Sequence, residues 1–180
     1  MPQKLIILDR DGVINYDSDQ FIKSPQEWRP IEGSLEAIAL LNQFGWRVVV
    51  ATNQSGVGRG LFDMQALNAM HNKMLALLSP LGGKVAGIFF CPHTPEDECN
   101  CRKPLPGLFY DIAWRFGRQD LSGVPVVGDS WRDIEAGIFV GCQPYLVLTG
   151  KGQKTYRQYD FPVQTKVRVN LSAVAQELVP

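Results

Sequence analysis

The sequence lacks an excess of charge of either sign, and it lacks a long hydrophobic run. Its 180 residues include 18 basic and 18 acidic side chains, so the net charge is zero. Because non-specific binding to nucleic acid or an anionic membrane needs a basic surplus, we expect neither partner. No apolar stretch approaches the ~20 residues of a membrane span, and the run at 5–8 is too short for a signal peptide. We therefore expect a cytoplasmic protein.

Cysteine and histidine are also scarce, with four and two residues, but most of them lie in one short segment. The pattern C-x-H-x5-C-x-C is formed by Cys91, His93, Cys99 and Cys101. Three thiolates and one imidazole complete the tetrahedral shell of a structural zinc ion, and in a reducing compartment such clustering favours metal over a disulfide. Incidental thiols or a surface disulfide are the alternatives. We expect Zn²⁺ to fix this loop, which directly precedes Arg102 and Lys103.

Short apolar runs alternate with helical patterns along the chain. Strands are expected at 4–8, 46–51, 85–90, 124–128, 144–148 and 166–169, and helices at 33–45, 63–78, 106–117 and 131–140 and after Asn170. The stretch 150–165 shows no clear period. This alternation predicts a three-layer, Rossmann-like α/β/α fold with a mostly parallel sheet. At this length the chain is expected to be one domain, residues 1–180, with 91–101 as an inserted loop.

Polar residues follow the predicted strands, at the edge where parallel sheets carry their sites. Asp9 and Asp11 come after the first strand, and two carboxylates so spaced can share a divalent cation. The second strand is followed by 52–55 (TNQS), whose hydroxyl, amide and backbone N–H groups suit a phosphate. Arg102 and Lys103 precede a helix, and Asp129 follows the fourth strand. Each motif alone is also typical of a solvated turn, but together they predict metal-assisted phosphoryl transfer.

The ordered motifs are LDRDGVIN (8–15), TNQSGVGRG (52–60), CPH (91–93), CNCRKPLPG (99–107) and VGDSWRD (127–133). Over about residues 4–150 this set resembles the haloacid dehalogenase (HAD) superfamily of phosphatases. Within it, the likeness is greatest to a small group that acts on heptose bisphosphates or histidinol phosphate. The resemblance implies a HAD-like fold, and the short segments between the motifs leave no room for a large cap domain.

The resemblance also implies a role for each matching residue. Asp9 is expected to be the nucleophile that forms an aspartyl-phosphate, and Asp11 the general acid and base. Mg²⁺ would be held by Asp9, the main-chain carbonyl of Asp11 and Asp129. Thr52 and Lys103 are expected to hold the phosphoryl oxygens. Substrate contacts are expected at Asp17, Asp19, Gln20, Asn53, Gln54, Ser55, Arg59 and Arg102.

Two further residues bear on the details. Asp133 is expected to orient Lys103 or a metal-bound water rather than to bind metal directly. Ser130 departs from the group's pattern, which often has Lys at this position, so that a cation is either missing or supplied by Arg132.

The resemblance leaves two substrates open. Arg59 suits a second phosphate, so the first hypothesis is removal of the 7-phosphate of a D-glycero-D-manno-heptose 1,7-bisphosphate, a precursor of lipopolysaccharide. The alternative is histidinol phosphate. A polynucleotide phosphatase is disfavoured by the neutral charge. A non-enzymatic regulatory or zinc-centred interaction module would have no use for the complete catalytic set. We expect a monomer.

Overall fold

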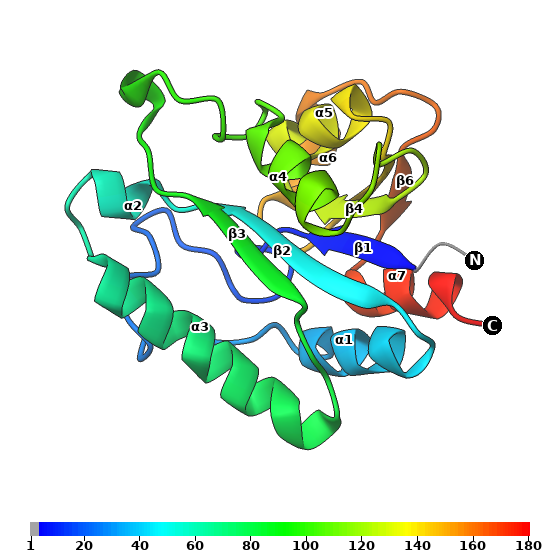
Figure 1. Ribbon diagram of the computed structural model, residues 1–180, viewed down its shortest axis with the longest axis horizontal. Helices are drawn as coiled ribbons and strands as arrows, with labels where there is room; N and C mark the ends of the chain where they lie inside the picture. Colours follow the sequence, from blue (N-terminus) through cyan, green and yellow to red (C-terminus); the bar gives the residue numbers. More distant parts are fainter. Residues whose placement is uncertain (1–3) are drawn as a thin grey trace.

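The computed structural model describes residues 4–180, which form one parallel sheet between two layers of helices (Figure 1). The strand order is β3-β2-β1-β4-β5-β6, and every neighbouring pair is parallel. The strands are β1 (Leu5–Leu8), β2 (Arg47–Asn53), β3 (Gly87–Cys91), β4 (Pro125–Gly128), β5 (Gln143–Val147) and β6 (Lys166–Arg168). This confirms the predicted three-layer α/β/α class.

Helices cover both faces of the sheet. They are α1 (Ser34–Gln43), α2 (Ser55–Gly58), α3 (Met64–Leu78), α4 (Gly107–Arg115), α5 (Trp131–Phe139), α6 (Gly152–Gln158) and α7 (Leu171–Leu178), with 3₁₀ turns η1 (Ser79–Leu81) and η2 (Pro95–Asp97). In Figure 1, α1, α3 and α7 lie below the sheet, and α4, α5 and α6 lie above it. No helix among residues 4–180 has the length and hydrophobicity that a membrane crossing needs.

The central strand shows why these residues form a sheet that is buried on both sides. All four residues of β1 are buried. Ile6 and Leu8 belong to the core beneath α1, α3 and α7, whereas Leu5 and Ile7 belong to the core beneath α4 and α5. Successive side chains on a strand point to opposite faces, so a strand between two helical layers must be apolar throughout. The continuous apolar run in the sequence follows from this position.

The predicted helix ends are confirmed where a side chain caps them. Asp63 accepts a hydrogen bond from the Ala66 amide at 2.8 Å at the start of α3, and Asn170 accepts one from the Ala173 amide at 3.0 Å at the start of α7. Each satisfies a backbone N–H that has no partner within its own helix. Gly45 follows α1 with φ 82°, a conformation that glycine adopts without strain.

Helix α6 was not expected, because its sequence, GQKTYRQ, has no apolar period. Its buried residues are Gly152 and Thr155. The Thr155 hydroxyl donates to the Asp129 carbonyl at 2.8 Å, and a Cβ on Gly152 would lie 1.7 Å from the Val147 carbonyl oxygen. Close backbone approach and a polar contact hold this helix, so hydrophobic periodicity could not reveal it.

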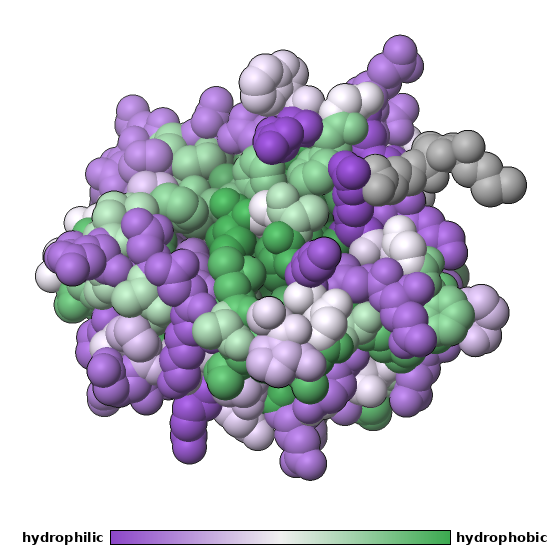
Figure 2. Space-filling view, turned by 60° about the horizontal axis from the view of Figure 1, so that its bottom comes forward, coloured by the Kyte–Doolittle hydropathy of each residue, from purple (hydrophilic) through white to green (hydrophobic). Residues whose placement is uncertain are grey.

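The layer of α1 and α3 is turned forward in Figure 2. Hydrophobic residues gather in a hollow near the middle of this view and hydrophilic residues surround them. One shallow cavity of about 670 Å³ lies between α1 and η1 and includes Ala39, Leu40 and Leu81 in its wall. It carries none of the predicted site residues, which lie instead at the carboxyl ends of the strands.

Candidate active site

A cleft of about 210 Å³ lies where the strands β1, β2 and β4 end. Its wall is formed by Asp9, Asp11, Asp17, Ser18, Asp19, Phe21, Ile22, Asn53, Gln54, Ser55, Arg59, Arg102, Lys103, Asp129, Arg132 and Lys151. Because β1 lies between β2 and β4, the loops after these three strands necessarily meet. The structure thus brings together most of the predicted site residues, from segments more than 100 positions apart.

Two predicted site residues, Thr52 and Gln20, do not line this cleft, and a third, Asn53, lines it but uses its side-chain amide to bind Lys103. Thr52 is buried beneath it, and its hydroxyl oxygen accepts a hydrogen bond from Gln54 Nε2 at 2.9 Å. Gln20 is exposed and its carbonyl accepts from Lys23 Nζ at 3.1 Å. Asn53 lines the cleft, but its amide bonds both the carbonyl and the amide of Lys103, each at 3.0 Å.

A larger cavity of about 470 Å³ lies elsewhere, beside Leu5, Arg47, Phe116 and Asp120. It opens at the amino end of β1, away from the loops that follow the strands. Phosphoryl-transfer chemistry needs converging carboxylates, and Asp120 is the one carboxylate in its described wall. Chemistry rather than volume therefore identifies the smaller cleft as the site.

Three buried carboxylates, which we call the acidic group, lie at one side of the cleft or just behind it: Asp9, Asp129 and Asp133. Each offers an oxygen within 4.8 Å of the other two. Burial, then the nearby Asp133, raises the pKa of Asp9 to about 6. Burial and the same neighbour raise the pKa of Asp129 well above its usual range. Carboxylates that repel one another in a buried site are the ligands expected for a divalent cation.

Gly12 shows how closely the first loop approaches this group. Its φ is +83°, and a Cβ at this position would lie 1.9 Å from Asp129 Oδ2. Any side chain here would displace the carboxylate. The glycine after the Asp-x-Asp pair is therefore required by contact with Asp129 as well as by the turn.

Lys103 is the cation built into the acidic group. Its Nζ lies 2.7 Å from Asp133 Oδ1 and 3.1 Å from Asp9 Oδ1, and it donates to the Ala51 carbonyl at 2.7 Å. Burial alone lowers the pKa of Lys103, but the two carboxylates outweigh it and raise that pKa. The contact between Asp133 and Lys103 is the one needed if Asp133 orients Lys103, the first of the two roles expected for it. Asp133 also accepts from the Ser130 amide and hydroxyl, so it caps α5 at the same time.

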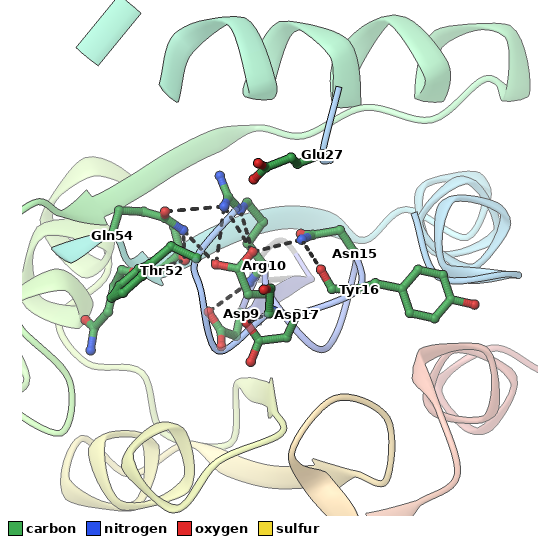
Figure 3. Close-up of polar contacts among 12 residues, drawn as sticks. Asp9, Arg10, Asn15, Tyr16, Asp17, Glu27, Thr52 and Gln54 are labelled. Atoms are coloured by element: carbon green, nitrogen blue, oxygen red, sulfur yellow. Dashed lines mark hydrogen bonds and ion pairs between the residues drawn. The ribbon is translucent and has the colours of Figure 1, made fainter. Parts of the chain in front are cut away.

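Asp11 lies on the same loop as Asp9 but faces hydrogen-bond donors, which we call the donor shell: Arg10, Asn15 and Gln54. Asn15 Nδ2 donates to Oδ1 at 2.8 Å, Gln54 Nε2 donates to Oδ2 at 2.9 Å, and Arg10 donates through Nε and Nη2. Figure 3 shows Gln54 and Asn15 on opposite sides of Arg10. Burial raises the pKa of Asp11, but the charge of Arg10 and these bonds outweigh it and lower that pKa.

The rim of the cleft carries charges of both signs. Lys151 Nζ lies 3.3 Å from Asp17 Oδ2 and 3.6 Å from Asp19 Oδ1, while its backbone N–H donates to Asp129 Oδ2 at 2.8 Å. Lys151 was not predicted from the sequence. Its place just after β5, at the same sheet edge, was the available signal. Three guanidinium groups also line the cleft: Arg59, Arg102 and Arg132.

The four predicted zinc ligands converge beside this rim. Cys91 Sγ lies 3.0 Å from Cys101 Sγ and 3.7 Å from Cys99 Sγ, and His93 Nδ1 lies 3.5 Å from Cys91 Sγ. With Zn–S bonds of about 2.3 Å, sulfur atoms of a tetrahedral site lie roughly 3.8 Å apart. The cysteines are not in disulfides. The four donor atoms all lie within 4.8 Å of one another, although the sulfur atoms of Cys91 and Cys101 are closer than in a zinc-bound site, and the donor set fits zinc.

Similar proteins show which family this chain belongs to. A family model described as HAD-hydrolase-like matches residues 100–172. The D-glycero-β-D-manno-heptose-1,7-bisphosphate 7-phosphatase of Bordetella bronchiseptica is 58% identical over 176 residues, which covers 98% of each chain. The phosphatase of the same name from Pseudomonas aeruginosa is 51% identical and covers 99% of each chain.

Solved structures agree with these relatives. A crystal structure of the D,D-heptose 1,7-bisphosphate phosphatase from B. bronchiseptica, complexed with magnesium and phosphate, superposes with a TM-score of 0.95 over 97% of each chain, at 58% identity. The enzyme of that name from Burkholderia thailandensis has a TM-score of 0.78 over 98% of each chain, at 48% identity. The expected resemblance to HAD phosphatases is confirmed. The chain belongs to the D-glycero-β-D-manno-heptose-1,7-bisphosphate 7-phosphatase family of HAD-like phosphoric monoester hydrolases.

Proposed function

We propose that this protein removes the 7-phosphate of D-glycero-β-D-manno-heptose 1,7-bisphosphate, as the names of its relatives suggest, in the synthesis of a lipopolysaccharide precursor. The observation that carries the proposal is the distribution of charge in the cleft. Asp9, Asp129 and Lys103 line the cleft on its buried side, whereas Arg59, Arg102 and Arg132 stand elsewhere in the wall. Burial is the largest cause that lowers the pKa of Arg102, and the charges of Arg132 and Arg59 lower it as well. The three guanidinium groups therefore lie close together. Clustered guanidinium groups suit a second phosphate.

Histidinol phosphate fits this wall less well, because it carries an amine in place of the second phosphate. Asp17 and Asp19 are the rim carboxylates that an amine would need, and Lys151 lies against both of them. Since Lys151 offsets these carboxylates, the charge that remains on the wall is the positive charge of its guanidinium groups. We propose a monomeric enzyme that acts as one domain, with the loop 91–101 as an insertion.

The acidic group fits a magnesium ion, and the relative's magnesium complex supports this choice. Asp9, Asp129 and the main-chain carbonyl of Asp11 would hold it. When bound, Mg²⁺ neutralises charge between the nucleophile and the phosphate. Zinc would be held by the four ligands of the Cys loop in a closed shell, where it stabilises the segment leading to Arg102 and Lys103.

The reaction has two displacements at phosphorus. Asp9 attacks the 7-phosphate, so that an Asp9–phosphorus bond forms as the bond from phosphorus to the sugar oxygen breaks. Asp11, whose lowered pKa leaves it ionised in the free enzyme, must first take up a proton from solvent, and it gives this proton to that oxygen. Water then attacks the aspartyl-phosphate, Asp11 takes the proton from this water, and inorganic phosphate leaves. Asp9 Oδ1 accepts from the Arg10 amide at 2.8 Å and from Lys103 Nζ, which fixes its orientation.

The test compares phosphate release from the heptose 1,7-bisphosphate and from histidinol phosphate, with Mg²⁺ and with Asp9→Asn as the control. We expect about 100-fold higher kcat/KM for the bisphosphate, which is about 2.7 kcal/mol of transition-state discrimination. Arg59→Ala should raise KM for the bisphosphate far more than for the 7-monophosphate. Preference for histidinol phosphate, or equal effects of Arg59→Ala on both sugar phosphates, would contradict the assignment.

A further inference from the structure

Arg10 lies between the two aspartates, yet its side chain points away from the cleft. It is fully buried, with 0% of its surface exposed. A buried guanidinium is strongly destabilising unless its donors are satisfied. Nε and Nη2 donate to Asp11 at 3.0–3.3 Å, Nη2 also donates to Gln54 Oε1 at 3.3 Å, and Nη1 lies 3.2 Å from His71 Nε2. Every arm of the group is therefore engaged.

The contact with His71 determines the state of that imidazole. A guanidinium donates hydrogen bonds and accepts none. Nε2 of His71 must therefore be the acceptor, which makes the ring the neutral tautomer with its proton on Nδ1. Burial, then the charge of Arg10, lowers the pKa of His71 to about 4, against the opposing charge of Asp11. His71 thus stays a neutral acceptor at neutral pH.

Asp11 connects Arg10 to the cleft, whose wall it forms together with Gln54. About 21% of its side chain is exposed, compared with 0% for Arg10. Two arms of the planar guanidinium grip its carboxylate, and such a fork fixes orientation as well as position. His71, on α3, holds a third arm in place. A contact on a helix of the lower layer is in this way connected to a group in the cleft.

From this geometry we propose that Arg10 is a positioning residue for Asp11, and that His71 serves the reaction by fixing the orientation of Arg10. The proposal rests on the function proposed above, in which Asp11 protonates the leaving oxygen. If Asp11 is held less well, the step that suffers is proton transfer to the leaving group. The effect must therefore depend on how much the leaving group needs a proton.

The test uses two kinds of phosphate ester with the Mg²⁺-loaded enzyme. The sugar phosphate leaves as a strongly basic alkoxide, whereas p-nitrophenyl phosphate leaves as a stable phenolate that needs no proton. The value of kcat/KM reports the first displacement for both. Since a positioned acid contributes about 10²–10⁴-fold, we expect His71→Leu to lower kcat/KM about 10-fold for the sugar phosphate, and Arg10→Met about 100-fold. Both should change it less than about 3-fold for p-nitrophenyl phosphate.

Two variants separate positioning from general loosening of the fold. His71→Gln keeps an acceptor for Arg10 and should restore kcat/KM for the sugar phosphate to within about 3-fold of the original. Lys73→Met, on the same helix, removes a side chain that donates to the Pro25 and Trp28 carbonyls at 2.6 and 2.7 Å and does not contact Arg10. It should show no dependence on the leaving group.

Equal losses on both esters in His71→Leu would overturn the inference, as would a Gln variant no better than the Leu variant. If Arg10→Met does not fold, the His71 pair decides. Failure of the proposed function looks different, because the unmodified enzyme would then not hydrolyse the heptose bisphosphate. Histidinol phosphate, also an alkyl ester, would then serve as the test substrate, and no hydrolysis of any of the three esters would overturn both proposals.

Discussion

Asp9 faces two further carboxylates and the ammonium of Lys103, whereas Asp11, two residues later, faces three side chains that donate hydrogen bonds. The pKa of Asp9 is raised to about 6 and that of Asp11 is lowered. Both carboxylates are held in the same loop, so the difference comes from what each one faces. The acidic group needs an external cation to carry its full negative charge, and the donor shell does not.

The largest effects on activity are expected from replacing the two aspartates, Asp9 and Asp11. Asp9→Asn should lower kcat by about 10⁴-fold or more, since the nucleophile is lost. Asp11→Asn should lower it by about 10²–10⁴-fold, the usual contribution of a general acid and base. Mass spectrometry after mixing with p-nitrophenyl phosphate should find a phosphorylated protein in Asp11→Asn and none in Asp9→Asn. A phosphoryl group on Asp9→Asn would place the nucleophile elsewhere.

Lys103→Met tests the acidic group through stability. Without Mg²⁺, it leaves Asp9 and Asp133 buried without their cation, so we expect the free energy of unfolding to fall by about 3–5 kcal/mol. Lys166→Met is the matched control, because Lys166 pairs with Glu177 at 2.8 Å near the surface and should contribute less than about 1 kcal/mol. Urea denaturation measures both. Similar losses in the two variants would show that burial of Lys103 with its carboxylates does not increase their contribution to the free energy of unfolding.

Removal of Mg²⁺ should reveal the opposite signs of the two pKa shifts. The pKa of Asp9 is raised from 3.8 to about 6 in the folded protein, so the folded state binds more protons between these values. Stability should therefore fall as pH rises through this window, by up to ~3 kcal/mol. Asp129, with its raised pKa, acts in the same direction. The stabilisation from Asp11 is present above 3.8 and is lost as pH falls below it.

Calorimetric Tm values across this pH range, in dialysed protein with and without added Mg²⁺, measure the effect. Mg²⁺ should abolish the fall, and Asp9→Asn should reduce it in the metal-free protein. A stability that rises with pH in metal-free protein would contradict the assigned environment of Asp9.

The smallest effect is expected in the donor shell. Asn15→Ala removes one donor from Asp11, which leaves two others in place. We expect a loss of about 1.5–3 kcal/mol in the free energy of unfolding, the usual value for one hydrogen bond to a charged group. Chemical denaturation should give the same loss with and without Mg²⁺. A loss that Mg²⁺ removes would instead connect Asn15 to the acidic group.

The sequence allowed the acidic group to be predicted, but not the donor shell. Asp9 and Asp129 directly follow apolar strands, and parallel strands bring such residues to one edge. The direction of the Arg10 side chain depends on His71 and Gln54, which come from distant segments. Lys151 was not predicted for a similar reason, because it belongs to the site through contacts with Asp17 and Asp129, which are distant in sequence. Local sequence patterns predict well where strands end, but they predict poorly in which direction a side chain points.

The place of β1 in the middle of the sheet has a consequence for synthesis on the ribosome. This strand is made first, and its partner β2 follows within about 50 residues, but its other edge pairs with Val126 and Val127 of β4. Until those residues emerge, one edge of the most apolar strand stays open, and such edges invite pairing with other chains. Asp9 therefore meets Asp129 only after β4 has been made, and a nascent chain that stalls before β4 leaves this edge of β1 unpaired.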